Sequence, residues 1–363
     1  MDNFDSDPRR LNAPWREARG DRAEGRTMRK RSGRNGFLIW QAVRRTVALD
    51  RVAPIAVIRV TWRWLVRCCL LISVLALAGC ADRPMPAAPG GESLRDGPAV
   101  PMQLWRADAQ EEAVILALHG FGDSGALTFP GAAAAWNARG ITVYAPDQRG
   151  FGASVTRKRW PGSAALISDA IALSREIRRR HPSVPLVVVG HSMGAAVALA
   201  AAREGLDADA LVLAAPAITG GGEIDPFSRA GAWTLSMFLP DRRWSAERVI
   251  DVRPSDNVVA MRLVSRDPRH FATPSSRELY GLLRLMDRAA AAAPQVDLPV
   301  ITLMGKKDGF LNPARVRRAH ETIAGAGAFI FYEEGWHWLF RDLQAARVWG
   351  DVGDFVLAQR ARP

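Results

Sequence analysis

Cysteine is scarce in this sequence. The chain of 363 residues contains three cysteines, at positions 68, 69 and 80, and none follows them. The long part of the chain after residue 80 can therefore form no internal disulfide, whatever its compartment. The same absence excludes a thiol nucleophile from that part.

The main body also lacks an excess of charge of one sign. The net charge is +12, but residues 1–67 hold 16 Lys and Arg against 7 Asp and Glu, a balance of +9. Residues 68–363 hold the other 33 and 30, a balance of +3. The basic character belongs to the N-terminal part, and we expect no nucleic acid partner for the main body.

A short apolar stretch, residues 68–78, follows two arginines. It is too short to span a bilayer as a helix, and this order of charged and apolar residues is typical of a secretory signal. It leads into Leu-Ala-Gly-Cys at residues 77–80, which resembles the lipobox of bacterial lipoproteins. The resemblance implies that residues 60–80 are a lipoprotein signal peptide and that Cys80 is acylated, which would anchor the protein to a membrane. An uncleaved signal anchor is the alternative interpretation.

The segments on either side of this signal are irregular. Residues 1–59 are basic and low in apolar periodicity, so we expect a disordered extension, or a start codon assigned too early in front of Val57 or Val60. Residues 81–101 are rich in proline and glycine and predict a tether between the lipid and the folded body. Ala81 stands where inner-membrane lipoproteins usually carry aspartate, so we expect the outer membrane of a bacterial envelope, on its periplasmic side.

The main body alternates short apolar runs with longer alanine-rich segments. The runs are almost wholly apolar, as expected of strands that are covered on both faces. We predict strands at residues 114–118, 141–145, 186–189, 211–214, 300–304 and 329–332. We predict helices at residues 127–139, 164–180, 193–203, 314–324 and 339–358. The alternation indicates an α/β fold with a mostly parallel sheet and helices on both faces.

One long interval breaks the alternation. Residues 217–297 contain no clear strand but many Trp, Phe, Leu, Met and Arg residues. We predict that they form a helical cap inserted between two core strands. The α/β core then comprises residues 102–216 and 298–363.

A serine stands between two glycines where a predicted strand meets a predicted helix. Gly-His-Ser-Met-Gly at residues 190–194 matches the G-x-S-x-G elbow, in which the serine has a strained backbone. We expect that side chains in place of Gly190 and Gly194 would collide with the strand and helix. A serine nucleophile needs a base, a group that orients the base, and donors for an oxyanion. Ser192 is the candidate nucleophile, and a helix-capping serine is the alternative.

The candidate base is one of only six histidines. His337 directly follows the last predicted strand, and an open parallel sheet places binding residues at the carboxyl ends of its strands. We therefore assign His337 as the base. The other five are His191, which the turn directs away, His119 in the candidate oxyanion loop, His181 in an entry loop, His270 in the cap and His320 in a helix.

The acid that orients the base should also follow a strand end. Asp308 lies about four residues beyond the predicted strand 300–304 and precedes His337 in sequence. It would accept a hydrogen bond from one ring nitrogen of the base and stabilise the imidazolium. A turn aspartate in Asp-Gly is the alternative interpretation. Glu223 and Asp225, after the preceding strand, are the fallback acids.

Two backbone N–H groups are candidates for the oxyanion hole. One belongs to Met193, the residue after the nucleophile. The other belongs to Phe121, in the His-Gly-Phe-Gly loop that follows the first predicted core strand. A plain glycine-rich turn is the alternative for this loop.

Together these segments resemble one enzyme family. "LALHGFGDSG", "VYAPDQRGFGAS", "PLVVVGHSMGAAVALA", "LVLAAPAI", "GKKDGF" and "EGWHWLF" occur between about residues 113 and 345. They are similar to the monoacylglycerol lipase and lysophospholipase branch of the α/β-hydrolases, also described as serine aminopeptidase S33-like. The order Ser192, Asp308, His337 is the one that α/β-hydrolases use. The resemblance implies ester hydrolysis through an acyl-enzyme, with no metal or cofactor.

Two positions depart from the family pattern, and one loop recurs in it. Ala195 replaces the last glycine of the usual "GHSMGG", and Trp338 stands where many relatives carry an acidic residue. The second departure bears on the substrate more than on the mechanism. Asp147, Arg149 and Gly150 belong to a loop that relatives keep near the active site, and we assign them no chemistry.

The substrate is predicted only as a class. Trp233, Met237 and Phe238, in an apolar part of the cap, are candidates for an acyl-chain pocket, although such a stripe could equally pack the cap onto the core. A monoacylglycerol or lysophospholipid would suit a lipid-anchored hydrolase. An aminopeptidase is the runner-up, with Glu333 and Glu334 as candidates to hold a substrate amino group. A catalytically silent lipid-anchored binding protein is the third hypothesis.

Overall fold

The computed structural model describes residues 99–220, 224–245 and 252–361. All of them belong to the unit Cys80–Pro363. Predictions for residues 1–98, including the lipobox and Cys80, lie outside the described residues. Among the helices that are described, none has the length and hydropathy needed to cross a membrane.

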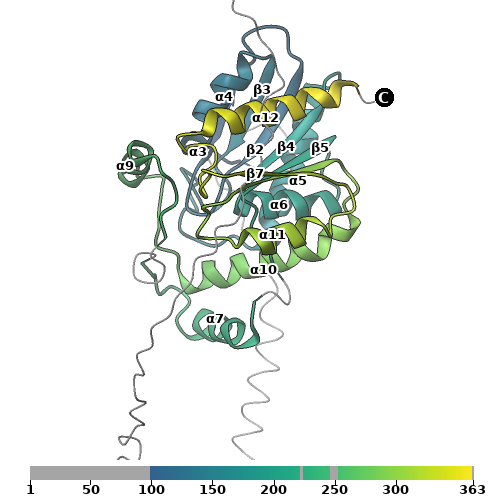
Figure 1. Cartoon of the computed structure of the whole chain (residues 1–363). Helices are drawn as coiled ribbons and strands as arrows, with labels where there is room; N and C mark the ends of the chain where they lie inside the picture. The colour runs from purple at the N-terminus through teal and green to yellow at the C-terminus, as the bar shows by residue number, and fades with distance from the viewer. Residues whose placement is uncertain (1–98, 221–223, 246–251, 362–363) are drawn as a thin grey trace, which may run out of the picture. The chain divides into compact units, whose positions relative to one another are not determined.

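One seven-stranded sheet forms the centre of the fold (Figure 1). The strand order is β1-β3-β2-β4-β5-β6-β7; β1 pairs antiparallel with β3 and all other pairs are parallel. The strands are β1 (Met102–Trp105), β2 (Ala113–Leu118), β3 (Ile141–Pro146), β4 (Leu186–His191), β5 (Ala210–Ala214), β6 (Val300–Gly305) and β7 (Ala326–Tyr332). The predicted mostly parallel α/β sheet is confirmed.

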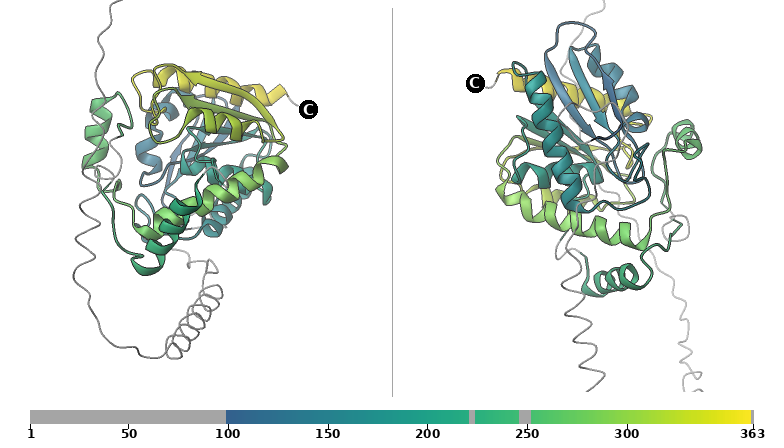
Figure 2. Two further views of the ribbon diagram at one scale, coloured as in Figure 1. Left: turned by 60° about the horizontal axis from the view of Figure 1, so that its bottom comes forward. Right: turned by 180° about the vertical axis from the view of Figure 1, so that it is seen from behind.

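Helices cover both faces of the sheet (Figures 1 and 2). Inner strands are buried on both sides, so alternate residues of one strand enter two different cores. The helices outside the interval between β5 and β6 are α3 (Gly125–Thr128), α4 (Pro130–Asn137), α5 (Ser163–Arg180), α6 (Met193–Arg203), α11 (Pro313–His320) and α12 (Ala345–Ala358), with a final 3-10 turn, η4 (Gln359–Ala361). In β2, Val114 and Leu116 pack toward α5, α6 and α10 (Ser276–Ala292), whereas Ile115 and Ala117 pack toward α4 and α12.

Several predicted boundaries differ from the structure. The helix predicted at 127–139 is two helices, α3 and α4, because Pro130 lacks a backbone N–H and starts a new helix. The helix predicted at 339–358 begins only at Ala345, after a turn in which Asp342 N–H donates to the Trp338 carbonyl. Strand β1 had no prediction at all.

Between β5 and β6 the described chain forms helices and no named strand. These are α7 (Pro226–Phe238), α9 (Val258–Arg266), α10 (Ser276–Ala292) and the 3-10 turn η3 (Ala293–Gln295). Helix α10 packs along α6, and its Leu285 and Ala289 are fully buried in the main core. Helix α7 lies against the outer side of α10 and has no buried residue, and α9 buries only Val264 (Figure 2). Residues 221–223 and 246–251 of this interval lie outside the described residues.

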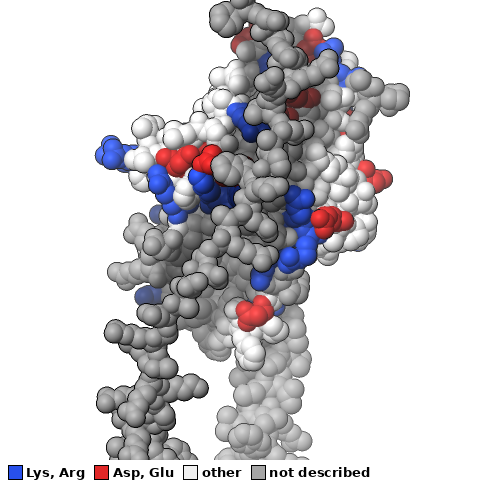
Figure 3. Space-filling view, viewed as in Figure 1, with Lys and Arg blue, Asp and Glu red and all other residues white. Residues whose placement is uncertain are grey.

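Charged side chains of both signs mix on the surface of the main body. On the face shown in Figure 3, Lys and Arg of the described residues lie beside Asp and Glu. Exposed ion pairs of this kind include Lys306 with Glu333 and Lys307 with Glu334. The near-neutral balance of the main body therefore comes from interspersed charges.

Candidate active site

The elbow at the end of β4 projects Ser192 from a strained backbone. Its φ of 53° and ψ of −112° lie in a region that residues with a side chain rarely adopt, at a cost of about 1–3 kcal/mol. A Cβ on Gly190 would lie 2.5 Å from Ala195 Cα, and one on Gly194 would lie 2.1 Å from the Leu118 carbonyl oxygen. The predicted steric reason for both glycines is confirmed. Glycine at both positions lets β4, α6 and β2 pack around the serine.

Three distant segments bring one hydroxyl, one imidazole and one carboxylate together. His337 Nδ1–H donates to Asp308 Oδ2 at 2.7 Å, and Ser192 Oγ lies 3.1 Å from His337 Nε2. The carboxylate accepts a hydrogen bond from Nδ1–H, which leaves Nε2 as the acceptor for the hydroxyl. All three residues follow strand ends at the same edge of the sheet, after β4, β6 and β7. The structure thus brings together the three residues named from the sequence.

The environment of Asp308 favours its ionised form. Burial alone would raise the pKa of this carboxyl, but the His337 ring and N–H groups of Phe310 and Leu311 outweigh it, so the pKa lies below its usual value. These two backbone groups donate to Oδ1 at 2.8 and 3.0 Å. One oxygen is therefore fixed by the turn and the other faces the imidazole.

His191, next to the serine, is turned away from it as predicted. Its Nε2–H donates to the His337 carbonyl at 2.8 Å, and its Nδ1 has no hydrogen-bond partner among the described residues. Burial, followed by the neighbouring His337 ring, lowers the pKa of His191 to about 3, so the ring is neutral at physiological pH. His191 therefore holds the backbone of His337 through its carbonyl oxygen.

The loop after β2 lies beside the serine. A Cβ placed on Gly120 would be 3.3 Å from Ser192 Cβ. The Gly120 carbonyl accepts from His119 Nδ1–H at 2.8 Å and from Asp123 N–H at 3.4 Å. Because a trans peptide is planar, this fixes the Phe121 N–H in the opposite direction to that carbonyl. Among the described residues, neither this N–H nor that of Met193 donates to a protein acceptor.

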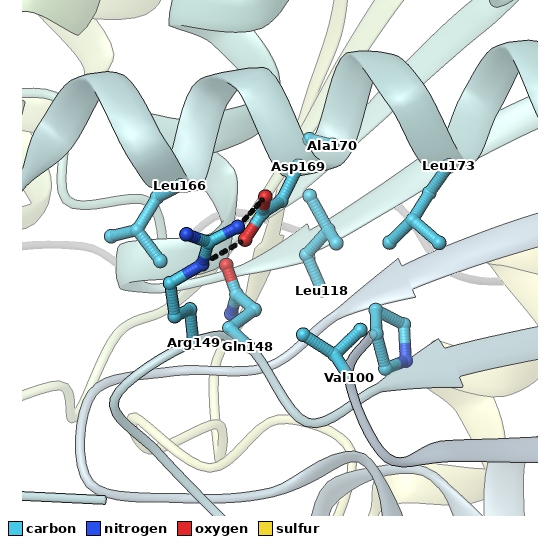
Figure 4. A pocket seen from close by; sticks show the side chains of 9 residues that line it. Val100, Leu118, Gln148, Arg149, Leu166, Asp169, Ala170 and Leu173 are labelled. Carbon is cyan, nitrogen blue, oxygen red and sulfur yellow. Dashed lines mark hydrogen bonds and ion pairs between the residues drawn. The ribbon is translucent and has the colours of Figure 1, made fainter. Parts of the chain in front are cut away.

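The Asp-Gln-Arg-Gly loop after β3 braces this region. Gln148 donates to the His119 ring through its backbone N–H at 2.9 Å, and to the His119 carbonyl through Nε2 at 2.7 Å. Arg149 forms a two-pronged ion pair with Asp169 of α5, at 2.9 and 2.6 Å (Figure 4). The cavity beside this pair measures about 10 Å³, room for at most one water. The loop is structural, and Gln148 is a supporting residue that the sequence did not single out.

Two further side chains near His337 were not predicted. The Phe310 ring lies 4.9 Å from the His337 ring, centroid to centroid, and is 42% exposed. Arg341 pairs with Asp123 of the loop after β2 at 2.5 Å and stacks on Trp338, with its guanidinium carbon 4.0 Å from the ring centroid. The tryptophan at this unusual position is thus held over a buried ion pair.

The other candidates from the sequence are not brought to the serine by any described contact. Trp233, Met237 and Phe238 lie on α7 and are 42%, 39% and 76% exposed. Asp225 is exposed and caps α7 by accepting from Ser228 N–H at 2.9 Å. The other fallback acid, Glu223, lies outside the described residues. The acyl-pocket assignment on α7 stays a prediction.

Known proteins are similar to this chain in sequence and in fold. The chain is 26% identical over 267 residues to a monoacylglycerol lipase of Mycolicibacterium smegmatis, covering 72% of this chain and 94% of that protein. It is 24% identical to the human monoglyceride lipase, covering 68% and 82%. The crystal structure of the Paleococcus ferrophilus monoacylglycerol lipase superposes with a TM-score of 0.60 at 19% identity, covering 72% of this chain and 99% of that one. Residues 109–344 match the family described as serine aminopeptidase, S33, and this chain is therefore a member of that family of α/β-hydrolases.

Proposed function

We propose that the protein is a serine hydrolase that cleaves carboxylic esters through an acyl-enzyme. The observation that carries the proposal is the continuous hydrogen-bonded chain from Asp308 through His337 to Ser192. It starts at an ionised carboxylate and ends at a hydroxyl on a strained elbow. The nucleophile, its base and the group that orients the base therefore lie within hydrogen-bond distance of one another.

The first half of the reaction forms the acyl-enzyme. Ser192 Oγ attacks the ester carbonyl carbon while its proton moves to His337 Nε2. Asp308 accepts from the opposite nitrogen and stabilises the imidazolium that results. The N–H groups of Phe121 and Met193 donate hydrogen bonds to the carbonyl oxygen and so stabilise the negative charge that develops on it.

The second half releases both products. His337 returns its proton to the oxygen of the leaving alcohol, and the C–O bond of the ester breaks. A water molecule then gives a proton to His337 and attacks the acyl-enzyme carbonyl, and the collapse of this intermediate regenerates the Ser192 hydroxyl and frees the carboxylic acid. The cycle consumes one ester and one water and needs no redox partner.

Monoacylglycerols or lysophospholipids are the proposed substrates. The support is the similarity to enzymes named monoacylglycerol and monoglyceride lipases; the match covers 94% of the Mycolicibacterium smegmatis enzyme and 72% of this chain. The proposal assigns Trp233, Met237 and Phe238, which expose apolar surface on α7, to contact with the acyl chain. Exposed apolar side chains are consistent with a substrate that arrives in a lipid aggregate.

An aminopeptidase activity has weaker support, despite the family's name. Such an activity needs carboxylates that are free to bind a substrate amino group. Glu333 and Glu334 are exposed and engaged with Lys306 and Lys307. The hydrogen bonds that align Asp308, His337 and Ser192 are required for catalysis and not for binding alone, so they argue against a catalytically silent binding protein.

The anchoring of the enzyme is part of the same proposal. The lipobox-like residues 77–80 support acylation of Cys80 and attachment to a bacterial envelope membrane, with the catalytic body on the periplasmic side. This location would place the hydrolase beside lipid substrates.

A substrate panel tests the function. Purified protein and the Ser192→Ala variant would be assayed on p-nitrophenyl esters of increasing chain length, on long-chain monoacylglycerols in detergent, and on aminoacyl amides. We expect hydrolysis of the acylglycerols by the wild type and a loss of at least about a thousandfold in the variant. Faster cleavage of aminoacyl amides would favour the peptidase, and equal activity of both proteins would overturn the serine mechanism.

A further inference from the structure

The backbone around His337 is held at three consecutive residues by three different partners. The Trp336 N–H donates to Asp342 Oδ2 at 2.7 Å. The His337 carbonyl accepts from His191, as described above. The Trp338 N–H donates to the Pro254 carbonyl at 2.9 Å. Two of these partners, His191 and Pro254, lie outside the loop between β7 and α12 that carries His337, and the third, Asp342, lies within it.

The second oxygen of Asp342 reaches into the insertion between β5 and β6. Ser255 Oγ–H donates to Asp342 Oδ1 at 2.6 Å, and the two residues are 0% and 3% exposed. A buried carboxylate that accepts one hydrogen bond per oxygen, from two separate segments, holds those segments at a fixed distance. Asp342 thus joins the residue before His337 to the insertion.

The contact extends along a short segment that we name the clamp, residues 254–257. The Asn257 side chain donates to the Arg341 carbonyl at 2.8 Å, and the Leu343 N–H donates to Asp256 Oδ1 at 2.9 Å. Asn257 also caps α9, since its side chain accepts from Ala260 N–H at 3.0 Å. The clamp is therefore fixed to a helix at one end and to the loop of His337 along its length.

We propose that Asp342 is a positioning residue that couples the clamp to the alignment of His337. The inference rests on the proposed function, because it gives the clamp a role in that reaction. Two of the three supports of the His337 backbone depend on the clamp: Pro254 directly, and Asp342 through Ser255. Movement of the clamp would displace the imidazole relative to Ser192 Oγ.

The electrostatics of Asp342 indicate that its role is not packing alone. Burial is the largest influence and raises the pKa of Asp342 to about 6, and the nearby Asp256 carboxylate raises it as well. The donors on Ser255 and Trp336, and the His337 ring, act in the opposite direction. A buried carboxylate with this raised pKa costs stability at neutral pH, so simple packing does not account for it.

A set of variants tests the coupling. Asp342→Ala removes both hydrogen bonds, Ser255→Ala removes only the link to the clamp, and Asp342→Asn keeps an acceptor and the shape. The rate constant kcat would be measured per active site, with sites counted by a fluorophosphonate, so that misfolded protein does not enter the result. Because small displacements of a catalytic group can cost up to about 100-fold in rate, we expect Asp342→Ala to lower kcat about 10- to 100-fold with KM changed less than about twofold.

The other variants define the mechanism of the loss. Ser255→Ala should lower kcat about 3- to 10-fold, and the double variant should be no worse than Asp342→Ala alone, because Ser255 acts through Asp342. Asp342→Asn should recover kcat to within about fivefold of the wild type. Glu278→Gln is the matched control: its carboxylate is buried and accepts from Ser275 N–H at 2.6 Å in the capping box of α10, so it should lower Tm and leave kcat unchanged.

A substrate-free readout separates this inference from the proposed function. The low-field proton resonance of His337 Nδ1–H should shift or broaden in Asp342→Ala and stay in place in Glu278→Gln. Unchanged kcat and an unchanged resonance in Asp342→Ala would overturn the coupling. Equal losses of kcat in Asp342→Ala and Glu278→Gln would overturn it too. A wild type without esterase activity would refute the proposed function alone, and the resonance would still decide the role of Asp342.

Discussion

Replacing Asp308 by asparagine tests how the proposed base is oriented. In the wild type, Oδ1 accepts from two backbone N–H groups, of Phe310 and Leu311, and Oδ2 faces His337 Nδ1 at 2.7 Å. The amide of the variant has one oxygen and one nitrogen. Turning the nitrogen toward the two backbone donors would leave both without an acceptor, at about 1–3 kcal/mol each. The turn therefore forces the amide nitrogen to face the imidazole.

This orientation puts the imidazole proton on the wrong nitrogen. The amide of Asp308→Asn would donate to Nδ1, so the ring would carry its proton on Nε2, 3.1 Å from Ser192 Oγ. A protonated Nε2 cannot accept the hydroxyl proton. Loss of the correct tautomer costs about 10⁴-fold in kcat, equivalent to about 5 kcal/mol of transition-state stabilisation. The fold should persist, because both backbone hydrogen bonds to the side chain are retained.

The assay compares kcat on a soluble ester with the thermal midpoint of each variant. Asp225→Asn is the control, because Asp225 is one of the two fallback acids and asparagine caps a helix about as well as aspartate. We expect a Tm within about 3 °C of the wild type for both variants and full activity for Asp225→Asn. Retention of more than about a tenth of kcat by Asp308→Asn, or an equal loss in the control, would show that Asp308 does not set the tautomer of His337.

Three other predictions concern packing, pH and anchoring. Gly194→Ala should lower the free energy of unfolding in urea by about 3 kcal/mol or more, because its Cβ would lie 2.1 Å from the Leu118 carbonyl oxygen; Gly231→Ala, with no atom within 4 Å, should not destabilise the protein. The pKa of Asp342 is raised to about 6 in the fold, so the folded state holds the proton more tightly than the unfolded state does. The free energy of unfolding of the wild type should therefore rise by up to about 3 kcal/mol as pH falls from 7 to 4, and that of Asp342→Asn should lack this rise. The same dependence of the free energy of unfolding on pH in both proteins would contradict the prediction. Cys80→Ser should abolish metabolic labelling by palmitate and release the protein from the membrane fraction, and undiminished labelling would refute the lipobox assignment.

The inner strands and their helices were predictable because burial dictates their composition. A strand that is covered on both faces reads as an uninterrupted apolar run, as in 186–189, which lies within β4. Strand β1 gives no such signal, since its four residues are all only partly buried and pair with β3 alone. Pro130 alone indicates the start of a new helix, but the apolar pattern on both sides of it favours a single helix.

The proposed catalytic residues were predictable because each has a local signal. Ser192 stands in a five-residue elbow, and Asp308 and His337 lie in the loops that follow β6 and β7. The residues that hold them have no local signal: Ser255 and Asp342 are 87 positions apart, and Asp123 and Arg341 are 218 apart. Only the fold brings such pairs together, so a single sequence indicates the reacting groups better than their supports.

Covalent labelling shows directly whether Ser192 is a nucleophile activated by His337. Folded wild-type protein would be treated with a fluorophosphonate and the modified peptide identified by mass spectrometry, alongside His337→Ala. We expect one adduct per chain, on Ser192, and a rate of labelling at least about 100-fold lower when the imidazole is removed. No adduct on folded protein, or a rate that does not depend on His337, would rule out an activated Ser192.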